Sequence, residues 1–251
     1  MKNKTMPNQP KRIAMWSGAR SLSTALMRAW ESRPDTVVWD EPLFPPYLLL
    51  SGDDYHSRQE VLTQCETDWV KVVKKMTIEP IPEGKTIYYQ KHISHLLLVD
   101  EMGMDWLSKL TNCILIRDPR EMLTSLYQKW HEITLNRTGL PHLEQIFQYI
   151  YETTGTILPI IDATDLQKEP RRILSLLCEA VGVEFTEAML NWPEGKRTTD
   201  GAWEKQWYES VKKSTGFRPY KPKADRIPEH LLDVLEQCNE IYQKLYEHRL
   251  Y

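Results

Sequence analysis

Residues 12–30 have the sequence Arg-Ile-Ala-Met-Trp-Ser-Gly-Ala-Arg-Ser-Leu-Ser-Thr-Ala-Leu-Met-Arg-Ala-Trp. Residues 13–16 are mostly large and apolar, Ser17 and Gly18 interrupt them, and apolar residues then recur at helical spacing from Leu22 onward. The pattern predicts a strand, a tight loop and a helix. We therefore expect an α/β fold organised around this junction.

The loop between this strand and this helix carries the groups that bind an anion. Backbone N–H groups, several hydroxyls and the guanidinium of Arg20 stand together at the positive end of the predicted helix. Such a site suits a phosphate or a sulfate ester. The candidate binding residues are Gly18, Ala19, Arg20, Ser21, Leu22, Ser23 and Thr24.

The loop differs from that of a nucleoside triphosphatase, which has the pattern Gly-x-x-x-x-Gly-Lys-Ser/Thr. Counting from Gly18, Ser23 and Thr24 stand in place of the second glycine and the lysine, and the cation is Arg20 instead. An Arg-Ser-x-Ser-Thr loop of this kind resembles the 5′-phosphosulfate-binding loop of sulfotransferases, which use 3′-phosphoadenylyl sulfate (PAPS). Taken alone, the loop is equally typical of a capped strand-to-helix junction.

The composition limits the classes of protein and partner. A chain of 251 residues can bury a sizeable core, and 32 basic against 35 acidic residues give a net charge of −3, so no overall field favours nucleic acid or an anionic membrane. The 4 cysteines form no Cys-x-x-Cys pair, which favours a reducing compartment, and no set of metal ligands is visible. We expect no nucleic-acid partner and no bound metal.

The ends and the hydropathy of the chain predict its organisation. No apolar run approaches the roughly 18–20 residues of a membrane span, and residues 1–11 are polar and basic without a secretory signal. We expect a flexible tail over residues 1–11, a single domain over residues 12–251, no membrane partner and a soluble, cytoplasmic protein.

Apolar segments alternate with helical patterns along the whole chain, which is typical of a parallel sheet covered by helices. We expect a three-layer α/β/α fold with about five parallel strands. The predicted strands are residues 13–16, 36–39, 86–90, 113–116 and 158–162.

Two carboxylates follow the second predicted strand, where open α/β sheets place their ligands. We interpret Asp40 as a cap of the next segment and Glu41 as a candidate general base for an acceptor hydroxyl. Glu41 followed by proline is also similar to the Glu-Pro of carbohydrate-type sulfotransferases. The insertion at 44–75 is either a lid over the site or a packed helical segment.

The third predicted strand leads into Lys91-His92-Ile93-Ser94-His95. This stretch resembles the Lys-Thr-His-Leu-Pro of cytosolic sulfotransferases, in which the histidine is the base and the lysine stabilises developing charge. If His92 is aligned with that histidine, Lys91 points to the opposite strand face, whereas if Lys91 is aligned, Ile93 replaces the histidine. The resemblance implies catalytic roles for His92 and Lys91, and the base remains open between His92, His95 and Glu41; a structural role for His92 is also open.

The fourth predicted strand ends in Arg117-Asp118-Pro119-Arg120-Glu121, in which Asp118 and Pro119 mark the start of a helix. Arg117 at the strand end and Ser125 eight residues later resemble the 3′-phosphate-binding element of sulfotransferases. A guanidinium fork and a hydroxyl match a phosphate dianion. The alternative is an Arg117 that only pairs with a neighbouring carboxylate.

A glycine-containing basic stretch near residue 200 resembles the sulfotransferase loop Arg-Lys-Gly-x-x-Gly-Asp-Trp, which closes over the nucleotide. The resemblance implies binding of the 3′-phosphate by Lys196, Arg197 and Gly201, and the alternative is an exposed loop with incidental charges. The basic, aromatic loop at 216–222 extends this possible lid.

The resemblance covers most of residues 12–217 in the family's order, and implies a P-loop-NTPase-like sulfotransferase fold. It implies transfer of a sulfuryl group from PAPS to a hydroxyl or amine of a small-molecule acceptor, with release of 3′,5′-ADP and without a metal. The alternatives are a P-loop-type kinase that uses ATP and magnesium, and a non-catalytic nucleotide-binding module. The acceptor and the oligomeric state stay open.

Overall fold

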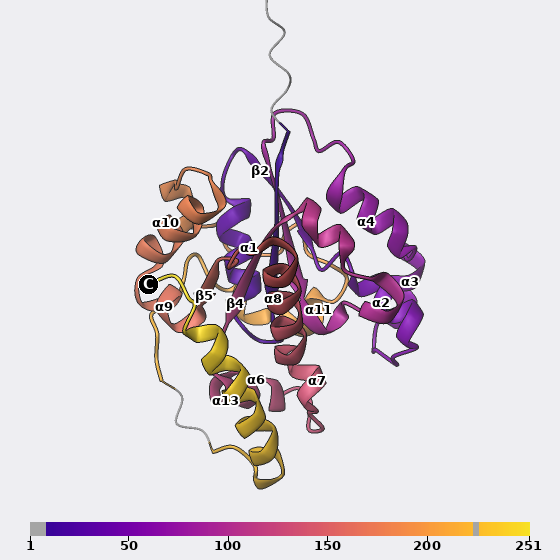
Figure 1. The fold of residues 1–251 in the computed structure, drawn as a ribbon, viewed down its shortest axis with the longest axis vertical. Helices are drawn as coiled ribbons and strands as arrows, with labels where there is room; N and C mark the ends of the chain where they lie inside the picture. The colour runs from indigo at the N-terminus through magenta and orange to yellow at the C-terminus, as the bar shows by residue number, and fades with distance from the viewer. Residues whose placement is uncertain (1–8, 223–225) are drawn as a thin grey trace, which may run out of the picture.

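Five parallel strands form one sheet in the order β2-β3-β1-β4-β5 in the computed structural model, which describes residues 9–222 and 226–251 (Figure 1). This confirms the predicted α/β fold with a central parallel sheet. The first strand begins at Lys11, within the expected tail, and residues 1–8 of that tail lie outside the described residues. The strands are β1 (Lys11–Ser17), β2 (Thr36–Asp40), β3 (Ile87–Ile93), β4 (Thr111–Ile116) and β5 (Ile160–Asp162).

Helices connect the strands and cover the sheet. The α-helices are α1 (Ser23–Glu31), α2 (Phe44–Ser51), α3 (Arg58–Gln64), α4 (Trp69–Thr77), α5 (Val99–Met102), α6 (Pro119–Tyr127), α7 (Leu135–Thr138), α8 (Leu140–Thr154), α9 (Ala163–Lys168), α10 (Pro170–Val181), α11 (Glu204–Trp207), α12 (Glu209–Lys212) and α13 (Leu232–Tyr246). The 3-10 turns are η1 (Ser94–Leu96), η2 (Asp105–Lys109), η3 (Glu187–Leu190) and η4 (Glu229–Leu231). None of these helices is long and apolar enough to cross a membrane.

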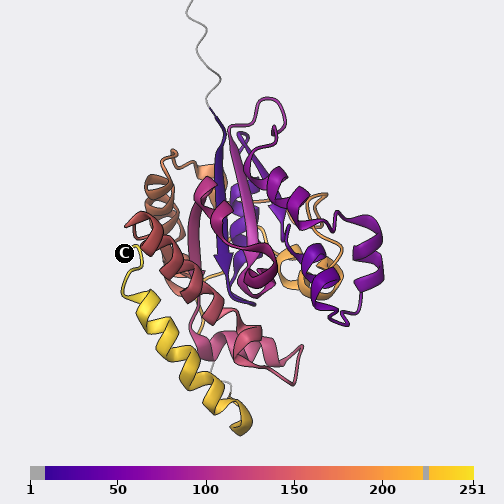
Figure 2. The same cartoon turned by 45° about the vertical axis from the view of Figure 1, so that its right-hand side comes forward.

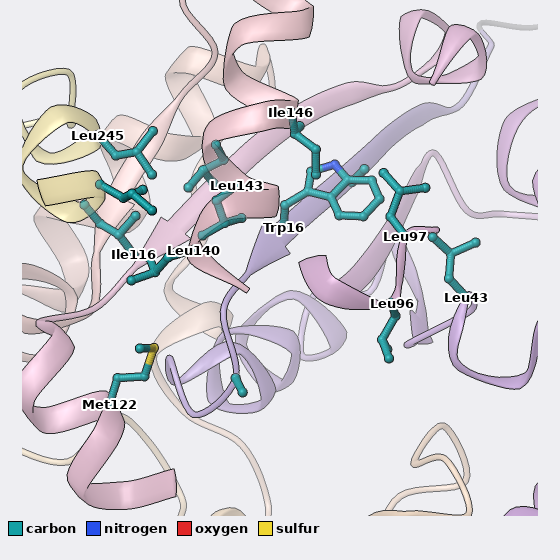
Figure 3. Close-up of a cluster of buried hydrophobic side chains, with 14 of the residues drawn as sticks. Trp16, Leu43, Leu96, Leu97, Ile116, Met122, Leu140, Leu143, Ile146 and Leu245 are labelled. Atoms are coloured by element: carbon teal, nitrogen blue, oxygen red, sulfur yellow. The ribbon is translucent and has the colours of Figure 1, made fainter. Parts of the chain in front are cut away.

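The side chains of the strands alternate between two hydrophobic clusters, one on each face of the sheet. Ile13 and Met15 of β1 pack against α1 and α10, while Ala14 and Trp16 pack with residues of α8 and α13 on the other face. Figure 3 shows Trp16 beside Leu143 and Ile146 of α8 and Leu97, which follows η1. Figure 2 shows α13 running along the outside of α8. Both faces are covered, as a parallel sheet requires.

The insertion after β2 forms the helices α2, α3 and α4, which lie on the opposite side of the sheet from α9 and α10 in Figure 1. Each of the three helices buries apolar side chains in the same cluster as Trp16, among them Leu48, Val61 and Val72. The insertion is therefore a set of packed helices in this structure.

The register of the sheet brings the ends of four strands to one edge. Ser17 at the end of β1 pairs with Ile93 of β3 and with Leu115 of β4, and Asp40 at the end of β2 pairs with Lys91 of β3. Because all strands are parallel, the loops that follow them emerge side by side. The candidate site lies at this edge.

Candidate active site

A cavity of about 390 Å³ opens at the carboxyl edge of the sheet. Six of the seven residues predicted for the anion-binding loop, 19–24, line it. The cavity is also lined by Glu41 after β2, Lys91 of β3, Arg117 after β4 and Ser125 of α6. Residues predicted from four separate stretches of sequence are thus brought together.

The loop between β1 and α1 adopts a backbone that is costly for residues with side chains. Arg20 and Leu22 have φ angles of 61° and 73°, in the left-handed region, which costs of order 1–3 kcal/mol per residue. Leu22 is the N-cap of α1, and no side chain caps the helix within the described residues. The first turn, with Ser23 and Thr24 lining the cavity, is therefore available to an anion.

Gly18 lies behind this loop and does not line the cavity. A Cβ atom on Gly18 would stand 2.6 Å from the carbonyl oxygen of Thr138, and the backbone N–H of Ala19 donates to that same oxygen at 3.2 Å. The absence of a side chain at position 18 lets the loop pack closely against the end of α7.

Arg20 contacts two side chains of the cavity wall. Its Nε atom donates to the Oγ atom of Ser125 at 3.1 Å, and its guanidinium stands 5.7 Å from the ring centroid of Trp207. Burial and the nearby positive charge of Arg117 lower the pKa of Arg20. No carboxylate among the described residues forms an ion pair with Arg20, so the cavity carries positive charge that an anion would neutralise.

Arg117 contacts both the loop and a carboxylate. Its Nη1 atom donates to the carbonyl oxygen of Arg20 at 2.8 Å, while its Nη2 atom lies 3.0 Å from the Oε2 atom of Glu121. Asp118 caps α6 by accepting from the backbone N–H of Glu121, as predicted. Arg117 therefore pairs with the predicted neighbouring carboxylate and also lines the cavity.

Lys91 is almost fully buried among hydrogen-bonding partners at the other end of the cavity. Its Nζ atom donates to the Oδ1 atom of Asp40 at 3.0 Å, to the hydroxyl of Tyr208 at 2.8 Å and to a carboxylate oxygen of Glu41. Burial alone would lower the pKa of Lys91, but the two carboxylates outweigh it and raise that pKa. Burial raises the pKa of Glu41, and the charge of Lys91 opposes this only in part.

Asp40 is not a cap of the next segment, and this interpretation was wrong. Besides Lys91, its carboxylate accepts hydrogen bonds from the hydroxyl of Tyr208 at 2.7 and 2.9 Å and from the backbone N–H of Gly201 at 3.1 Å. The helix that follows has Leu43 at its N-cap instead. Asp40 joins β2, β3 and the segment around residue 200, contacts that local sequence does not reveal.

The structure separates the two histidines. His92 lies on the strand face opposite to Lys91 and outside the cavity, stacked on Trp16 with ring centroids 4.2 Å apart. Ile93 lines the cavity two residues after Lys91, which corresponds to the alignment in which Ile93 replaces the family's histidine. His95 does line the cavity, and burial lowers its pKa to about 3, so its ring is neutral at pH 7. The candidates for a base inside the cavity are Glu41 and His95.

The predicted closing loop contacts other parts of the protein. Lys196 pairs with Glu204 at 3.1 Å, the Nε atom of Arg197 lies 3.7 Å from Glu31, and Gly201 donates to Asp40. Lys196, Arg197 and Gly201 do not line the cavity. The following segment does so, through Trp203, Trp207, Tyr208, Ser210 and Arg218.

Arg218 adds a third guanidinium to the cavity. It donates to the hydroxyl of Ser210 at 3.1 Å and to the carbonyl oxygen of Ser210 at 3.0 Å. Its signal in the sequence was the basic, aromatic loop at 216–222. Tyr208 had no such signal, because its partners Asp40 and Lys91 are far away along the chain. Within the described ranges, no group of three or more His, Cys, Asp or Glu side chains could hold a metal ion.

A parallel α/β sheet whose central strand leads through a tight loop into a helix is typical of a class of proteins that bind phosphate esters at the carboxyl edge of the sheet. Residues 11–245 match the sulfotransferase domain, and the chain belongs to this family.

Known structures and sequences resemble most of the chain. It shares its fold with a sulfotransferase from Alicyclobacillus acidocaldarius (TM-score 0.55, 12% identity, 96% of this chain and 97% of that one). It also resembles the sulfotransferase domain from the curacin biosynthetic pathway (TM-score 0.52, 16% identity, 95% of this chain and 98% of that one). Branched-chain-amino-acid aminotransferase-like protein 2 of Arabidopsis thaliana is 37% identical over 234 residues, which are 93% of this chain and 41% of that protein.

A second Arabidopsis thaliana relative, branched-chain-amino-acid aminotransferase-like protein 1, is 36% identical over 240 residues, 96% of this chain and 42% of that protein. The chain therefore spans about two fifths of the length of these curated relatives.

Proposed function

We propose that the chain transfers a sulfuryl group from PAPS to a hydroxyl or amine of a small-molecule acceptor and releases 3′,5′-ADP. The observation that carries the proposal is the pair Arg20 and Arg117: their two guanidiniums come from the ends of different strands and line one cavity, and the guanidinium of Arg117 donates to the backbone carbonyl oxygen of Arg20 at 2.8 Å. Like charges so close together favour an anionic ligand. Arg218 adds a further cation.

The order of the strands supports separate sites for the two anionic groups of such a donor. The loop after the central strand, with Arg20 and the first turn of α1, suits the phosphosulfate. Arg117 and Ser125 follow the adjacent β4, and with Arg218 they suit a 3′-phosphate, since guanidinium forks match a phosphate dianion.

The remaining charged groups supply the chemistry in this proposal. Glu41 accepts the proton of the acceptor as the acceptor oxygen or nitrogen forms its bond to sulfur, and the bond from sulfur to the bridging oxygen breaks with its electron pair. Arg20 and the N-terminus of α1 stabilise the charge on that leaving oxygen. Lys91 keeps its charge because Asp40 and Glu41 raise its pKa, and it stabilises the transferring group.

Calorimetry and a transfer assay test this proposal together. We expect 3′,5′-ADP to bind more tightly than ATP, with no requirement for magnesium, and labelled PAPS to donate its sulfuryl group. Arg20→Ala should weaken 3′,5′-ADP binding about 10-fold or more, as loss of a charge-assisted contact predicts. Arg197→Ala is the matched control, because this guanidinium lies outside the cavity.

Two outcomes would overturn the proposal. Tighter, magnesium-dependent binding of ATP would favour the kinase alternative. Binding of 3′,5′-ADP without transfer to any hydroxyl or amine compound would favour the non-catalytic module.

A further inference from the structure

We propose, on the basis of the function proposed above, that Asp40 is a positioning residue for the base Glu41. Asp40 binds the ammonium group of Lys91 outside the cavity, so that Lys91 orients Glu41 without fully neutralising it. The inference rests on the geometry of these three charged side chains at the ends of β2 and β3.

The backbone after β2 brings two adjacent carboxylates to one ammonium group. Neighbouring residues of a strand carry their side chains to opposite faces of the sheet, so an extended backbone would point Asp40 and Glu41 apart. Here the Nζ atom of Lys91 lies 3.0 Å from the Oδ1 atom of Asp40 and also bonds to the Oε1 atom of Glu41. The φ angle of 45° at Glu41 ends the extended backbone directly after Asp40 and lets both carboxylates reach Lys91.

Only one of the two carboxylates reaches the cavity. The side chain of Glu41 lines it and is 12% exposed, whereas that of Asp40 is 1% exposed and does not line it. Lys91 bonds to the Oε1 atom of Glu41, and the Oε2 atom accepts no hydrogen bond from the described residues. The Oδ2 atom of Asp40, by contrast, accepts from the hydroxyl of Tyr208 at 2.7 Å and from the backbone N–H of Gly201 at 3.1 Å. Glu41 therefore has an oxygen left for the proton of an acceptor, and Asp40 does not.

The ammonium group of Lys91 is divided between its partners. An ammonium group has three N–H donors, and those of Lys91 have three acceptors: Asp40, Glu41 and the hydroxyl of Tyr208. With both carboxylates ionised, the cluster carries one net negative charge. Lys91 thus holds Glu41 in place while Asp40 balances part of its positive charge.

The two charges that face Glu41 act on its pKa in opposite directions. Burial raises that pKa, the ammonium group of Lys91 lowers it and the carboxylate of Asp40 raises it. The phenols of Tyr208 and Tyr55 also face Glu41, and burial raises the pKa of each, so both are neutral at pH 7. Without the charge of Asp40, Glu41 would experience the attraction of Lys91 alone. It would then be a weaker base, and a weaker base removes a proton less efficiently.

Carbon-13 NMR of the full chain, labelled at the carboxyl carbons of the glutamate side chains, measures the pKa of Glu41. Glu41→Gln assigns the signal. We expect this pKa to be lower in Asp40→Asn than in the wild type by more than about 0.5 pH unit, because a nearby like charge raises the pKa of a carboxyl group. Asp165→Asn is the matched control: it removes an ion pair of 3.0 Å with Arg249, outside the cavity, and should leave the pKa of Glu41 unchanged.

A second variant separates the charge of residue 40 from its packing. Asp40→Glu keeps the charge but alters the packing, and it also serves if Asp40→Asn does not fold. We expect the pKa of Glu41 in Asp40→Glu to stay within about 0.5 pH unit of the wild-type value. A larger fall in Asp40→Glu overturns the inference, and so does a smaller fall or a rise in Asp40→Asn. Binding of 3′,5′-ADP is measured on the same samples, and a wild-type chain that binds none contradicts the proposed function itself.

Discussion

Arg20, Leu22 and Glu41 have positive φ angles of 61°, 73° and 45°, and among the described residues no other residue except glycine does. All three line the cavity. Neighbouring hydrogen bonds hold the backbone in these costly conformations: the N–H of Glu41 donates to the carbonyl oxygen of Lys91 at 2.9 Å, and its own carbonyl accepts from Phe44 at 3.0 Å. Backbone strain concentrated in this way is typical of functional sites.

Glu41→Gln should abolish most transfer, because an amide does not take up the proton of the acceptor. We expect a loss of about 10²- to 10⁴-fold in kcat, as removal of a general base predicts. Unfolding in urea, measured in parallel, checks that the variant is folded, since the buried Lys91 loses one charged partner and keeps Asp40. Unchanged kcat in the folded variant would contradict the role given to Glu41.

The pH profile of transfer distinguishes the two possible bases. Glu41 must be ionised to accept a proton, so kcat/KM should rise with pH through a pKa above the usual value of about 4.3 for glutamate. The pKa of His95 is lowered to about 3. With His95 as the base, kcat/KM would therefore rise with pH in a lower pH range than with Glu41. A limb near pH 3 that persists in Glu41→Gln would identify His95 as the base.

The segment that contains α11 and α12 closes the cavity through side chains anchored to the sheet. The hydroxyl of Tyr208 donates to Asp40 and accepts from Lys91 and from the indole N–H of Trp203 at 3.1 Å. Gly201 of the preceding turn donates to the same carboxylate. These bonds connect Asp40 at the end of β2 to residues that lie 161 and 168 positions further along the chain.

Tyr208→Phe should therefore loosen this segment. The substitution leaves the buried Asp40 and Lys91 each without one partner, which costs about 1–3 kcal/mol of unfolding free energy. Tyr149→Phe removes an exposed hydrogen bond to Asp105 and should change stability by no more than about 0.5 kcal/mol. Equal effects of the two substitutions in urea unfolding would show that Tyr208 is not an anchor.

For the whole molecule, the strands could be predicted from the sequence, but the contacts between distant segments of the chain could not. Four of the five predicted strands overlap the observed ones closely, since alternation and turn residues are local properties. β3 continues to Ile93, beyond the predicted end at residue 90. Neighbouring side chains of a strand point to opposite faces of the sheet, and the sequence alone does not show which face of β3 borders the cavity. It therefore left open whether Lys91 or His92 lies in the site.

The same division holds for the site. The loop at 18–24 and the Arg117–Ser125 pair were predictable, because a strand end followed by a helix fixes their location within a few residues. The network of Asp40 and Tyr208 and the place of Arg218 depend on how residues 201–218 cross the sheet edge. The spacing of residues within one segment does not predict where residues 201–218 cross the sheet.

The central claim is that one cavity binds a nucleotide through two separate anionic groups. Calorimetric affinities for 3′,5′-ADP and 5′-AMP, measured in the wild type and in Arg117→Ala, test it most directly. We expect the 3′-phosphate to strengthen wild-type binding at least about 10-fold and to contribute little in Arg117→Ala. Equal wild-type affinities for the two nucleotides, or a 3′-phosphate effect that persists in Arg117→Ala, would contradict the account.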